Sequence, residues 1–184
     1  MTYHMNIAGL DRNLPLCKLN DSLMIGAFVI FGDVELTEAS ARELLKKLPE
    51  KVDYLIAPEA KAIPLVYEMS RQSGIPYLLA RKKAKAYMSG VFQVEVRSIT
   101  TSGVQTLVID QADADAMRGK NIAIIDDVIS TGESLYAMEE LVKQAGGVIV
   151  SKMAILAEGD AQSRKDITFL EPLPLFDAQG KPLG

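Results

Sequence analysis

The chain has 184 residues, of which 48% are hydrophobic and 24% charged, a balance that excludes extensive disorder. The formal net charge is -4 and no long basic run occurs, so nucleic-acid binding is not expected. One cysteine and one histidine exclude an internal disulfide, a thiolate metal site and most histidine-based triads. Such cysteine usage favours a reducing, cytoplasmic setting. We expect no signal peptide and no membrane segment, because the longest apolar stretch, residues 23–31, is short and interrupted by glycine.

The first fifty residues predict a hairpin, a further apolar segment and a helix. Residues 3–19 are broken by glycine and proline, which is typical of two short strands joined by a turn. Residues 23–31 predict a strand or a buried loop. From Glu38 onwards apolar residues recur at helical spacing, with Thr37 as the expected N-cap and Pro49 ending the helix.

The next segment reads as one β-α-β unit. Residues 52–57 form a short apolar run of strand length, and residues 58–61 follow as a loop. Apolar residues then repeat at helical spacing until Gly74, which is a typical C-terminal stop. Residues 75–80 predict another strand. A helix between two strands requires that the strands be parallel.

A less regular region separates this unit from a second one. Residues 82–103 have no helical period, and the weak alternation in residues 91–96 predicts a hairpin or a mobile arm. Residues 106–109 read as a strand, and residues 110–120 as a polar connection with a short helix.

The second unit completes the prediction of an α/β fold. Residues 122–125 are wholly apolar, a helical face covers residues 135–145, and residues 148–156 read as the next strand. Alternating strands and helices predict a central, mainly parallel sheet that is flanked by helices on both faces. The tail after Glu171 is proline-rich, and we expect it to be extended on the surface.

The clearest chemical signal lies between the strand and the helix of the second unit. Asp126 and Asp127 are expected where the strand ends, and ligands bind beyond the carboxyl ends of parallel strands. Gly132 lets backbone amides approach an anion, and the helix start adds free N–H groups. Because carboxylates repel phosphate, the two acids must serve another part of the ligand, and a ribose diol suits them. The alternative is a strand that ends in solvated acids before a capped helix.

This segment, residues 124–134, reads IIDDVISTGES and resembles the phosphoribosyl-diphosphate motif of type I phosphoribosyltransferases. The resemblance implies that Asp126 and Asp127 hold the ribose hydroxyls and are the catalytic residues. It assigns the 5′-phosphate to the loop that follows. The residues of that loop are Ser130, Thr131, Gly132, Glu133 and Ser134.

The same resemblance assigns pyrophosphate binding to residues that follow two earlier strands. The assigned residues are Glu59, Ala60, Lys61, Arg81, Lys82 and Lys85. Lys61 stands where the family usually has arginine, so the positive charge is kept without the planar guanidinium of arginine. Ala62 stands where the family usually has glycine. The alternatives are a plain strand-to-helix turn and a solvated charged edge.

The base site is less clearly marked. Phe31 resembles a residue near the base pocket of adenine enzymes, and Glu158 follows the last strong strand, so both are candidates for base binding. A core phenylalanine and a solvated turn are the alternatives. The resemblance implies one domain over residues 1–184, with a small hood from about residues 1–35 and 157–184 over the base.

The function that the resemblance implies is transfer of 5-phosphoribosyl from phosphoribosyl diphosphate to a purine in purine salvage, with adenine slightly favoured. It further implies a homodimer, an arm over residues 85–105, and Mg²⁺ carried on the diphosphate. No dedicated protein metal site is expected, and Asp126 and Asp127 are the protein ligands to consider. The alternatives are a non-catalytic regulator that senses phosphoribosyl diphosphate or purine, and an enzyme for xanthine or another nucleobase.

Overall fold

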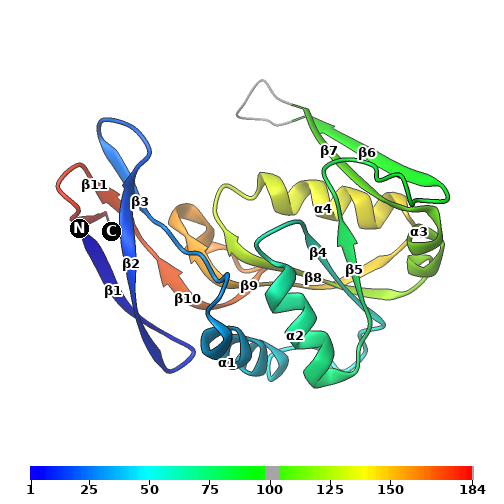
Figure 1. Cartoon of the computed structure of the whole chain (residues 1–184), viewed down its shortest axis with the longest axis horizontal. Coiled ribbons are helices and arrows are strands. Elements are labelled where there is room, and N and C mark those ends of the chain that lie inside the picture. Colours follow the sequence, from blue (N-terminus) through cyan, green and yellow to red (C-terminus); the bar gives the residue numbers. More distant parts are fainter. Residues whose placement is uncertain (98–103, 184) are drawn as a thin grey trace.

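The computed structural model describes residues 1–97 and 104–183, and a five-stranded parallel sheet forms its centre (Figure 1). The strand order is β10-β9-β8-β4-β5, and every neighbouring pair is parallel. The strands are β4 (Tyr54–Pro58), β5 (Tyr77–Ala80), β8 (Asn121–Ile129), β9 (Val148–Glu158) and β10 (Thr168–Leu173). The predicted α/β fold with a mainly parallel sheet is confirmed.

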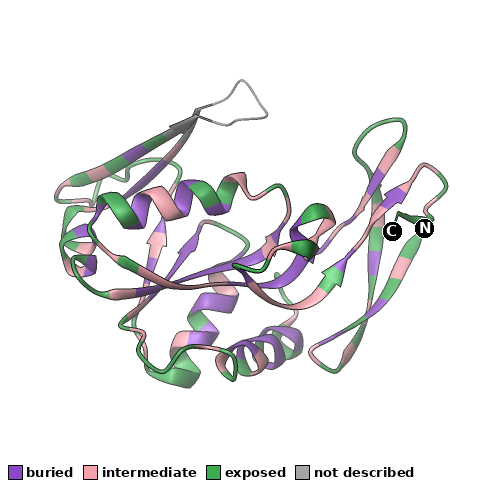
Figure 2. Ribbon diagram, turned by 180° about the vertical axis from the view of Figure 1, so that it is seen from behind, coloured by how far each residue is buried: buried purple, intermediate pink, exposed green. Residues whose placement is uncertain are grey.

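Helices cover both faces of this sheet, so its central strands are buried from two sides. The helices are α1 (Val34–Leu45), α2 (Ile63–Ser73), α3 (Gln111–Met117) and α4 (Glu133–Gln144). In β8, Ile122 and Ile124 pack in the core beneath α4, while Ala123 and Ile125 pack in the core with α1 and α2. Buried residues therefore run along the central strands and the inward helix faces (Figure 2). No helix within the described ranges is long and apolar enough to cross a membrane.

A second, antiparallel sheet combines segments that are far apart in the sequence. Its strands are β1 (Thr2–Ile7), β2 (Leu10–Lys18), β3 (Leu23–Gly26), β11 (Leu175–Asp177) and β12 (Pro182–Leu183). Residues 23–31 thus contain both expected features, since β3 is followed by a loop in which Phe28 and Ile30 are buried. The expected surface tail is wrong, because Leu173 and Phe176 are fully buried.

The irregular middle region forms a hairpin beside α4 and β5. Strands β6 (Val91–Arg97) and β7 (Val104–Asp110) pair antiparallel, as expected for one of the two alternatives. Val108 also bridges to Arg81 at the end of β5. Residues 98–103, which belong to the arm expected over residues 85–105, lie outside the described residues.

Helix α1 begins before its predicted start, and the reason is its cap. Asp33 accepts a hydrogen bond from the backbone N–H of Leu36 at 3.1 Å, which satisfies one of the free amides of the first turn. Thr37 was the predicted cap, but it lies inside the helix, where its hydroxyl donates to the carbonyl of Asp33 at 2.7 Å.

The cap of α1 also joins the helix to the antiparallel sheet. Arg12 of β2 donates to both carboxylate oxygens of Asp33, at 2.7 and 3.0 Å, and to Glu35 at 2.9 Å. The Arg12 guanidinium holds the pKa of Asp33 below its usual value, while partial burial opposes this shift. One carboxylate therefore starts a helix and fixes a neighbouring hairpin against it.

Two replacements of Asp33 separate these roles. Asp33→Asn keeps an oxygen for the cap and loses the ion pair, so we expect a loss of less than about 1 kcal/mol in the free energy of unfolding. Asp33→Ala removes both, and a further loss of about 1 kcal/mol is expected. Urea denaturation at pH 7 measures both losses.

The exposed Asp21 offers a control, since Asp21→Ala removes the same charge from a loop. Equal stabilities of the asparagine and alanine variants of Asp33 would show that the cap contributes nothing. Because the folded-state pKa of Asp33 is lowered, the ion-pair contribution is present at neutral pH and is lost as the pH falls through that value.

Candidate functional site

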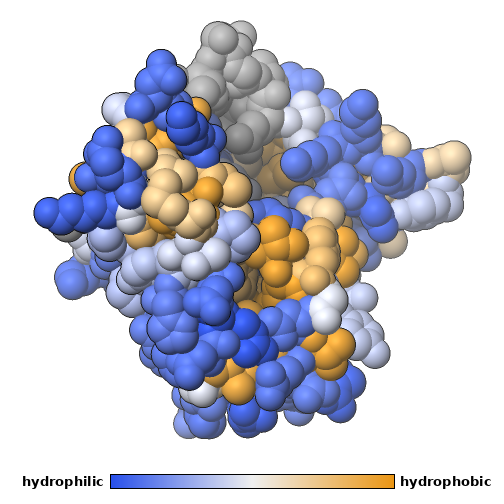
Figure 3. Space-filling view, turned by 60° about the vertical axis from the view of Figure 1, so that its left-hand side comes forward, coloured by the Kyte–Doolittle hydropathy of each residue, from blue (hydrophilic) through white to orange (hydrophobic). Residues whose placement is uncertain are grey.

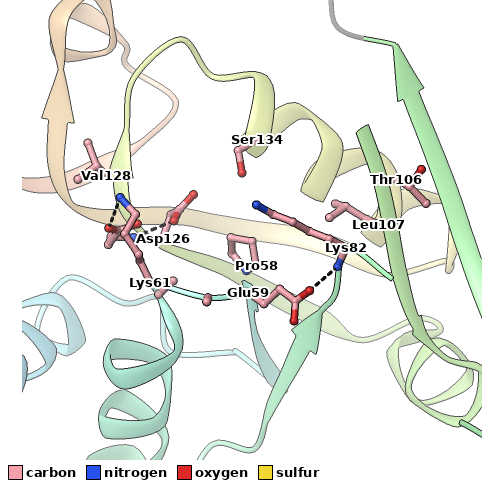
Figure 4. Close-up of a pocket in the computed structure, with 12 residues that line it drawn as sticks. Pro58, Glu59, Lys61, Lys82, Thr106, Leu107, Asp126, Val128 and Ser134 are labelled. Carbon is pink, nitrogen blue, oxygen red and sulfur yellow. Dashed lines mark hydrogen bonds and ion pairs between the residues drawn. The ribbon is translucent and has the colours of Figure 1, made fainter. Parts of the chain in front are cut away.

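A cavity of about 730 Å³ opens at the carboxyl ends of β4, β5 and β8 (Figure 4). This is the edge of a parallel sheet at which ligands bind. The lining residues are Pro58, Glu59, Ala60, Lys61, Ala62, Lys82, Thr106, Leu107, Asp126, Asp127, Val128 and Ser134. Parallel strands thus bring together two segments, residues 58–62 and residues 126–134, that the sequence marked separately.

Two adjacent carboxyl groups lie at the floor of this cavity. Asp126 is 7% exposed and Asp127 is 4% exposed. The sequence predicted that they follow the strand, but β8 continues beyond them, because β9 is long enough to pair with Val128 and Ile129. The two acids are therefore held by a sheet ladder on one side, with their side chains in a partly enclosed site.

Burial makes Asp126 a weaker acid than an exposed aspartate. Removal from water raises the pKa of Asp126 most, and the neighbouring Asp127 raises it further. Asp126 Oδ1 accepts a hydrogen bond from the backbone N–H of Asp127 at 2.9 Å, which partly offsets the rise. The Asp126 carboxyl group therefore keeps its proton to a higher pH than an exposed aspartate does.

Asp127 has a different environment. The ammonium of Lys61 lies 3.2 Å from Asp127 Oδ2 as an ion pair, and the Lys61 side chain is half exposed. Yet Oδ2 is buried and accepts no hydrogen bond of good geometry from any described residue. A buried acceptor without a donor costs about 1–3 kcal/mol, so this oxygen is suited to receive a hydrogen bond from a ligand.

The loop after β8 turns directly into α4. Gly132 has a φ of +83°, a value that non-glycine residues rarely adopt, and α4 begins at the next residue, Glu133. Thr131 Oγ1 accepts from the backbone N–H of Glu133 at 3.5 Å. Ser134 faces the cavity above Asp126 (Figure 4), whereas residues 130–133 adjoin the cavity without lining it.

Arg164, which was not predicted from the sequence as a site residue, packs on this loop. A Cβ atom on Gly132 would lie 2.7 Å from Nη1 of Arg164, so the guanidinium occupies the space that any side chain at Gly132 would need. Arg164 follows the turn of 3-10 helix η1 (Gly159–Ser163), which lies next to the loop (Figure 1). No spacing in the sequence links the two residues, because α4 and β9 separate them along the chain.

The predicted pyrophosphate residues divide into two groups. Lys82 points across the cavity toward Ser134, and its backbone N–H donates to Glu59 Oε1 at 2.8 Å (Figure 4). Arg81 lies 3.5 Å from the other oxygen of Glu59. Glu59 therefore holds the end of β5 against the loop that carries Ala60, in which the Glu59–Ala60 peptide is cis.

The remaining cations lie farther from the cavity. The Arg81 guanidinium stands 5.7 Å from the ring centre of Tyr87 and lines a separate cavity of about 240 Å³. Lys85 is exposed and lines neither cavity. Lys61 and Lys82 are thus the predicted cations that the structure places at the carboxylate pair.

Neither base-binding candidate lines the main cavity. Phe31 is 52% exposed, and Glu158 is half-buried at the end of β9. Burial raises the pKa of Glu158, and the nearby charge of Lys61 opposes that rise, so Glu158 lies on the Lys61 side of the site. An apolar hollow between more hydrophilic walls is visible on the molecular surface (Figure 3).

The two acidic side chains of the site offer oxygen atoms that could bind a divalent metal. Within the described part of the chain, no cluster of three or more histidine, cysteine, aspartate or glutamate side chains could hold a metal. Mg²⁺ commonly takes one or two carboxylates together with substrate phosphates. Asp126 and Asp127 provide oxygen ligands of this kind and fit such an arrangement.

Residues 34–177 match the family described as the phosphoribosyl transferase domain. The chain belongs to this family. The resemblance of residues 124–134 to type I phosphoribosyltransferases, and the enzyme class that it implied, are thereby confirmed.

Relatives of the chain are named for different bases. A hypoxanthine/guanine phosphoribosyltransferase of Methanococcus voltae is 28% identical over 135 residues, covering 73% of this chain and 68% of that protein. An orotate phosphoribosyltransferase of Methanopyrus kandleri is 28% identical over 134 residues, covering 72% and 62%. The chain thus spans about two thirds of these relatives.

A solved adenine phosphoribosyltransferase of Thermoanaerobacter pseudethanolicus superposes with a TM-score of 0.65 at 23% identity. The match covers 78% of this chain and 84% of that one. At this identity the likeness establishes the shared fold.

We expect Asp126→Asn to stabilise the folded protein. The folded-state pKa of Asp126 is raised, so its contribution to stability falls as the pH rises above the unfolded value, and asparagine lacks this dependence. Asparagine also keeps the oxygen that accepts from the N–H of Asp127. At pH 8 the melting temperature should rise by at least about 2 °C, and by less at pH 5.

Thermal denaturation at both pH values tests this, with the exposed Asp21→Asn as the matched control. A variant less stable than the wild type at pH 8 would mean that the buried carboxyl group supports the fold.

We expect Gly132→Ala to be more destabilising than Gly74→Ala. Both glycines have positive φ, at +83° and +75°, but a Cβ on Gly74 meets open space whereas one on Gly132 displaces Arg164. Strain alone costs about 1–2 kcal/mol at each position. Urea denaturation measures the loss in the free energy of unfolding for each variant, and the difference between the two losses is the cost of displacing Arg164. Equal losses would show that Arg164 moves away freely.

Proposed function

We propose that the protein transfers a 5-phosphoribosyl group from phosphoribosyl diphosphate to a purine base and releases pyrophosphate. The observation that carries the proposal is the buried Oδ2 of Asp127, which lies beside the loop at the start of α4. It pairs with Lys61 at 3.2 Å but accepts no hydrogen bond of good geometry from any described residue. A ligand that fits needs hydroxyl donors and a phosphate a short distance apart, and ribose 5-phosphate carries both. This reading fits the family to which the chain belongs.

In this proposal, each wall of the cavity binds a different group of phosphoribosyl diphosphate. Residues 130–134 hold the 5′-phosphate through backbone amides and hydroxyls at the positive end of α4. Asp126 and Asp127 receive the ribose hydroxyls. Lys61 and Lys82 stabilise the departing pyrophosphate, and Glu59 positions the two segments that carry them.

The chemistry requires little covalent help from the protein. Substitution at the anomeric carbon passes through an oxocarbenium-like state, so the site must orient the ribose and stabilise separated charges. Asp127, which forms an ion pair with Lys61, lies beside the proposed ribose position and favours positive charge on the ring. Mg²⁺ carried on the diphosphate would neutralise charge on the leaving group, with Asp126 and Asp127 as available protein oxygens.

For the acceptor, we propose a purine that is covered by a hood of residues 1–35 and 157–184. Phe31 and Glu158 are the proposed side chains at its edge. The adenine-like residue pattern supports adenine as the base, and the curated relatives named for hypoxanthine and guanine support a 6-oxopurine as the second candidate. We also propose a cytoplasmic homodimer.

The test is pyrophosphate release from phosphoribosyl diphosphate and Mg²⁺ with adenine, hypoxanthine, guanine, xanthine, uracil and orotate supplied one at a time. We expect release to require one purine class. Asp127→Asn should lower kcat/KM by at least about 100-fold, because the buried oxygen and its charge act on the ribose in the transition state.

Asp21→Asn is the control and should keep full activity. If the protein binds phosphoribosyl diphosphate tightly but no base causes release of pyrophosphate, the protein is a sensor of phosphoribosyl diphosphate and the enzyme proposal is wrong. Release only with orotate or uracil would overturn the choice of a purine.

A further inference from the structure

One edge of the Arg164 guanidinium donates hydrogen bonds to Asp166, and its other edge faces the loop at Gly132. Its Nε and Nη2 donate to the two oxygens of Asp166 at 2.9 and 2.7 Å. Its Nη1 donates to no acceptor within residues 1–97 and 104–183, and it faces the loop at Gly132. A guanidinium offers donors on both edges, so the free edge can serve an anion.

The edge that donates to Asp166 is fixed by a chain of ion pairs that reaches α4. Asp166 also accepts from the ammonium of Lys152, and Lys152 donates to Glu139 of α4 at 2.8 Å. Arg164 and Lys152 together hold the pKa of Asp166 far below its usual value. The Arg164 side chain is only 31% exposed, so the residues packed around it restrict its movement.

Gly132 meets two separate demands at this contact. Its positive φ shapes the turn into α4, and its missing side chain leaves room for Nη1 of Arg164. A turn alone would accept glycine for its backbone angle, as at Gly74, where a Cβ would meet nothing. The close approach of a cation to this loop is therefore a second feature of the site.

We propose that Arg164 is a binding residue of the 5′-phosphate site, which directs its Nη1 edge past Gly132 toward the bound phosphate. This rests on the proposed function of the loop. Backbone amides of residues 130–134 supply partial charges, and Arg164 adds a full positive charge that Asp166 balances on the far edge. Arg164 therefore acts on the 5′-phosphate and has no part at the pyrophosphate, which lies across the cavity near Lys82.

Two half-ligands of the donor separate this role from a general effect on the site. Isothermal titration of Arg164→Gln with ribose 5-phosphate should show an affinity about 10-fold below that of the wild type, as expected for one charge-assisted hydrogen bond. The affinity for Mg²⁺-pyrophosphate should change by less than about twofold, because that ligand binds at the other end of the cavity. The KM for phosphoribosyl diphosphate should rise with little change in kcat.

Arg118→Gln is the matched control, since Arg118 forms an exposed ion pair with Asp115 away from the loop. It should bind both half-ligands as the wild type does. Asp166→Asn frees Arg164 without removing its charge, and should weaken ribose 5-phosphate by a smaller factor, about threefold. This second variant carries the test if Arg164→Gln does not fold.

The possible outcomes distinguish the role of Arg164 from the proposed phosphoribosyl transfer. If the wild type binds ribose 5-phosphate and Arg164→Gln binds it equally well, the role of Arg164 is wrong while the phosphate loop stands. Equal weakening of both half-ligands, with a lower melting temperature, would show a merely structural residue and also overturn it. If the wild type binds neither ribose 5-phosphate nor phosphoribosyl diphosphate, the proposed function itself fails.

Discussion

Two neighbouring carboxyl groups inside a buried strand are the constraint on which the rest of the site depends. A parallel sheet that is covered on both faces normally consists of apolar residues, and β8 is apolar from Ile122 to Ile125. Burying Asp126 and Asp127 side by side raises the pKa of Asp126, and Oδ2 of Asp127 accepts no hydrogen bond of good geometry from the described part of the chain. This arrangement opposes folding stability, and it persists only because the packed strands around it provide enough stability to tolerate it.

The surrounding elements are arranged around this pair. Lys61 supplies one counter-charge from the segment after β4, and Lys82 extends from the end of β5. The start of α4 supplies positive character from above through Gly132 and the amides that follow it. Cationic and anionic groups thus alternate around one cavity, which suits a ligand that carries phosphates at both ends and hydroxyls between them.

Much of this arrangement could be predicted from the sequence, because local patterns produced it. The apolar run before Asp126, the glycine at position 132 and the helical period after it together indicate strand, loop and helix. The cap of α1 was assigned to Thr37 in place of Asp33, because either side chain can cap and only the contact with Arg12 decides between them. The end of β8 was placed too early, since the partner strand β9 determines how far the ladder continues.

Other features depend on contacts between distant segments and leave no local pattern. Arg164 reaches the loop only because η1 turns back over the edge of the sheet, and its spacing from Gly132 has no period. Glu59 was assigned to pyrophosphate, yet its carboxylate oxygens are engaged by Lys82 and Arg81. Phe31 looked like a stacking residue, but a single sequence does not show that it is half exposed outside the main cavity.

The antiparallel sheet has a consequence for the order in which the chain folds. Within the central sheet, the pairs β4–β5 and β8–β9 are each joined by one β-α-β unit, whereas β3 pairs with β11 across most of the sequence. Closing so long a loop costs more conformational entropy than closing a β-α-β unit, so pairing of this kind is slow. We therefore expect the central sheet, with its carboxylate pair, to assemble before β3 and β11 pair.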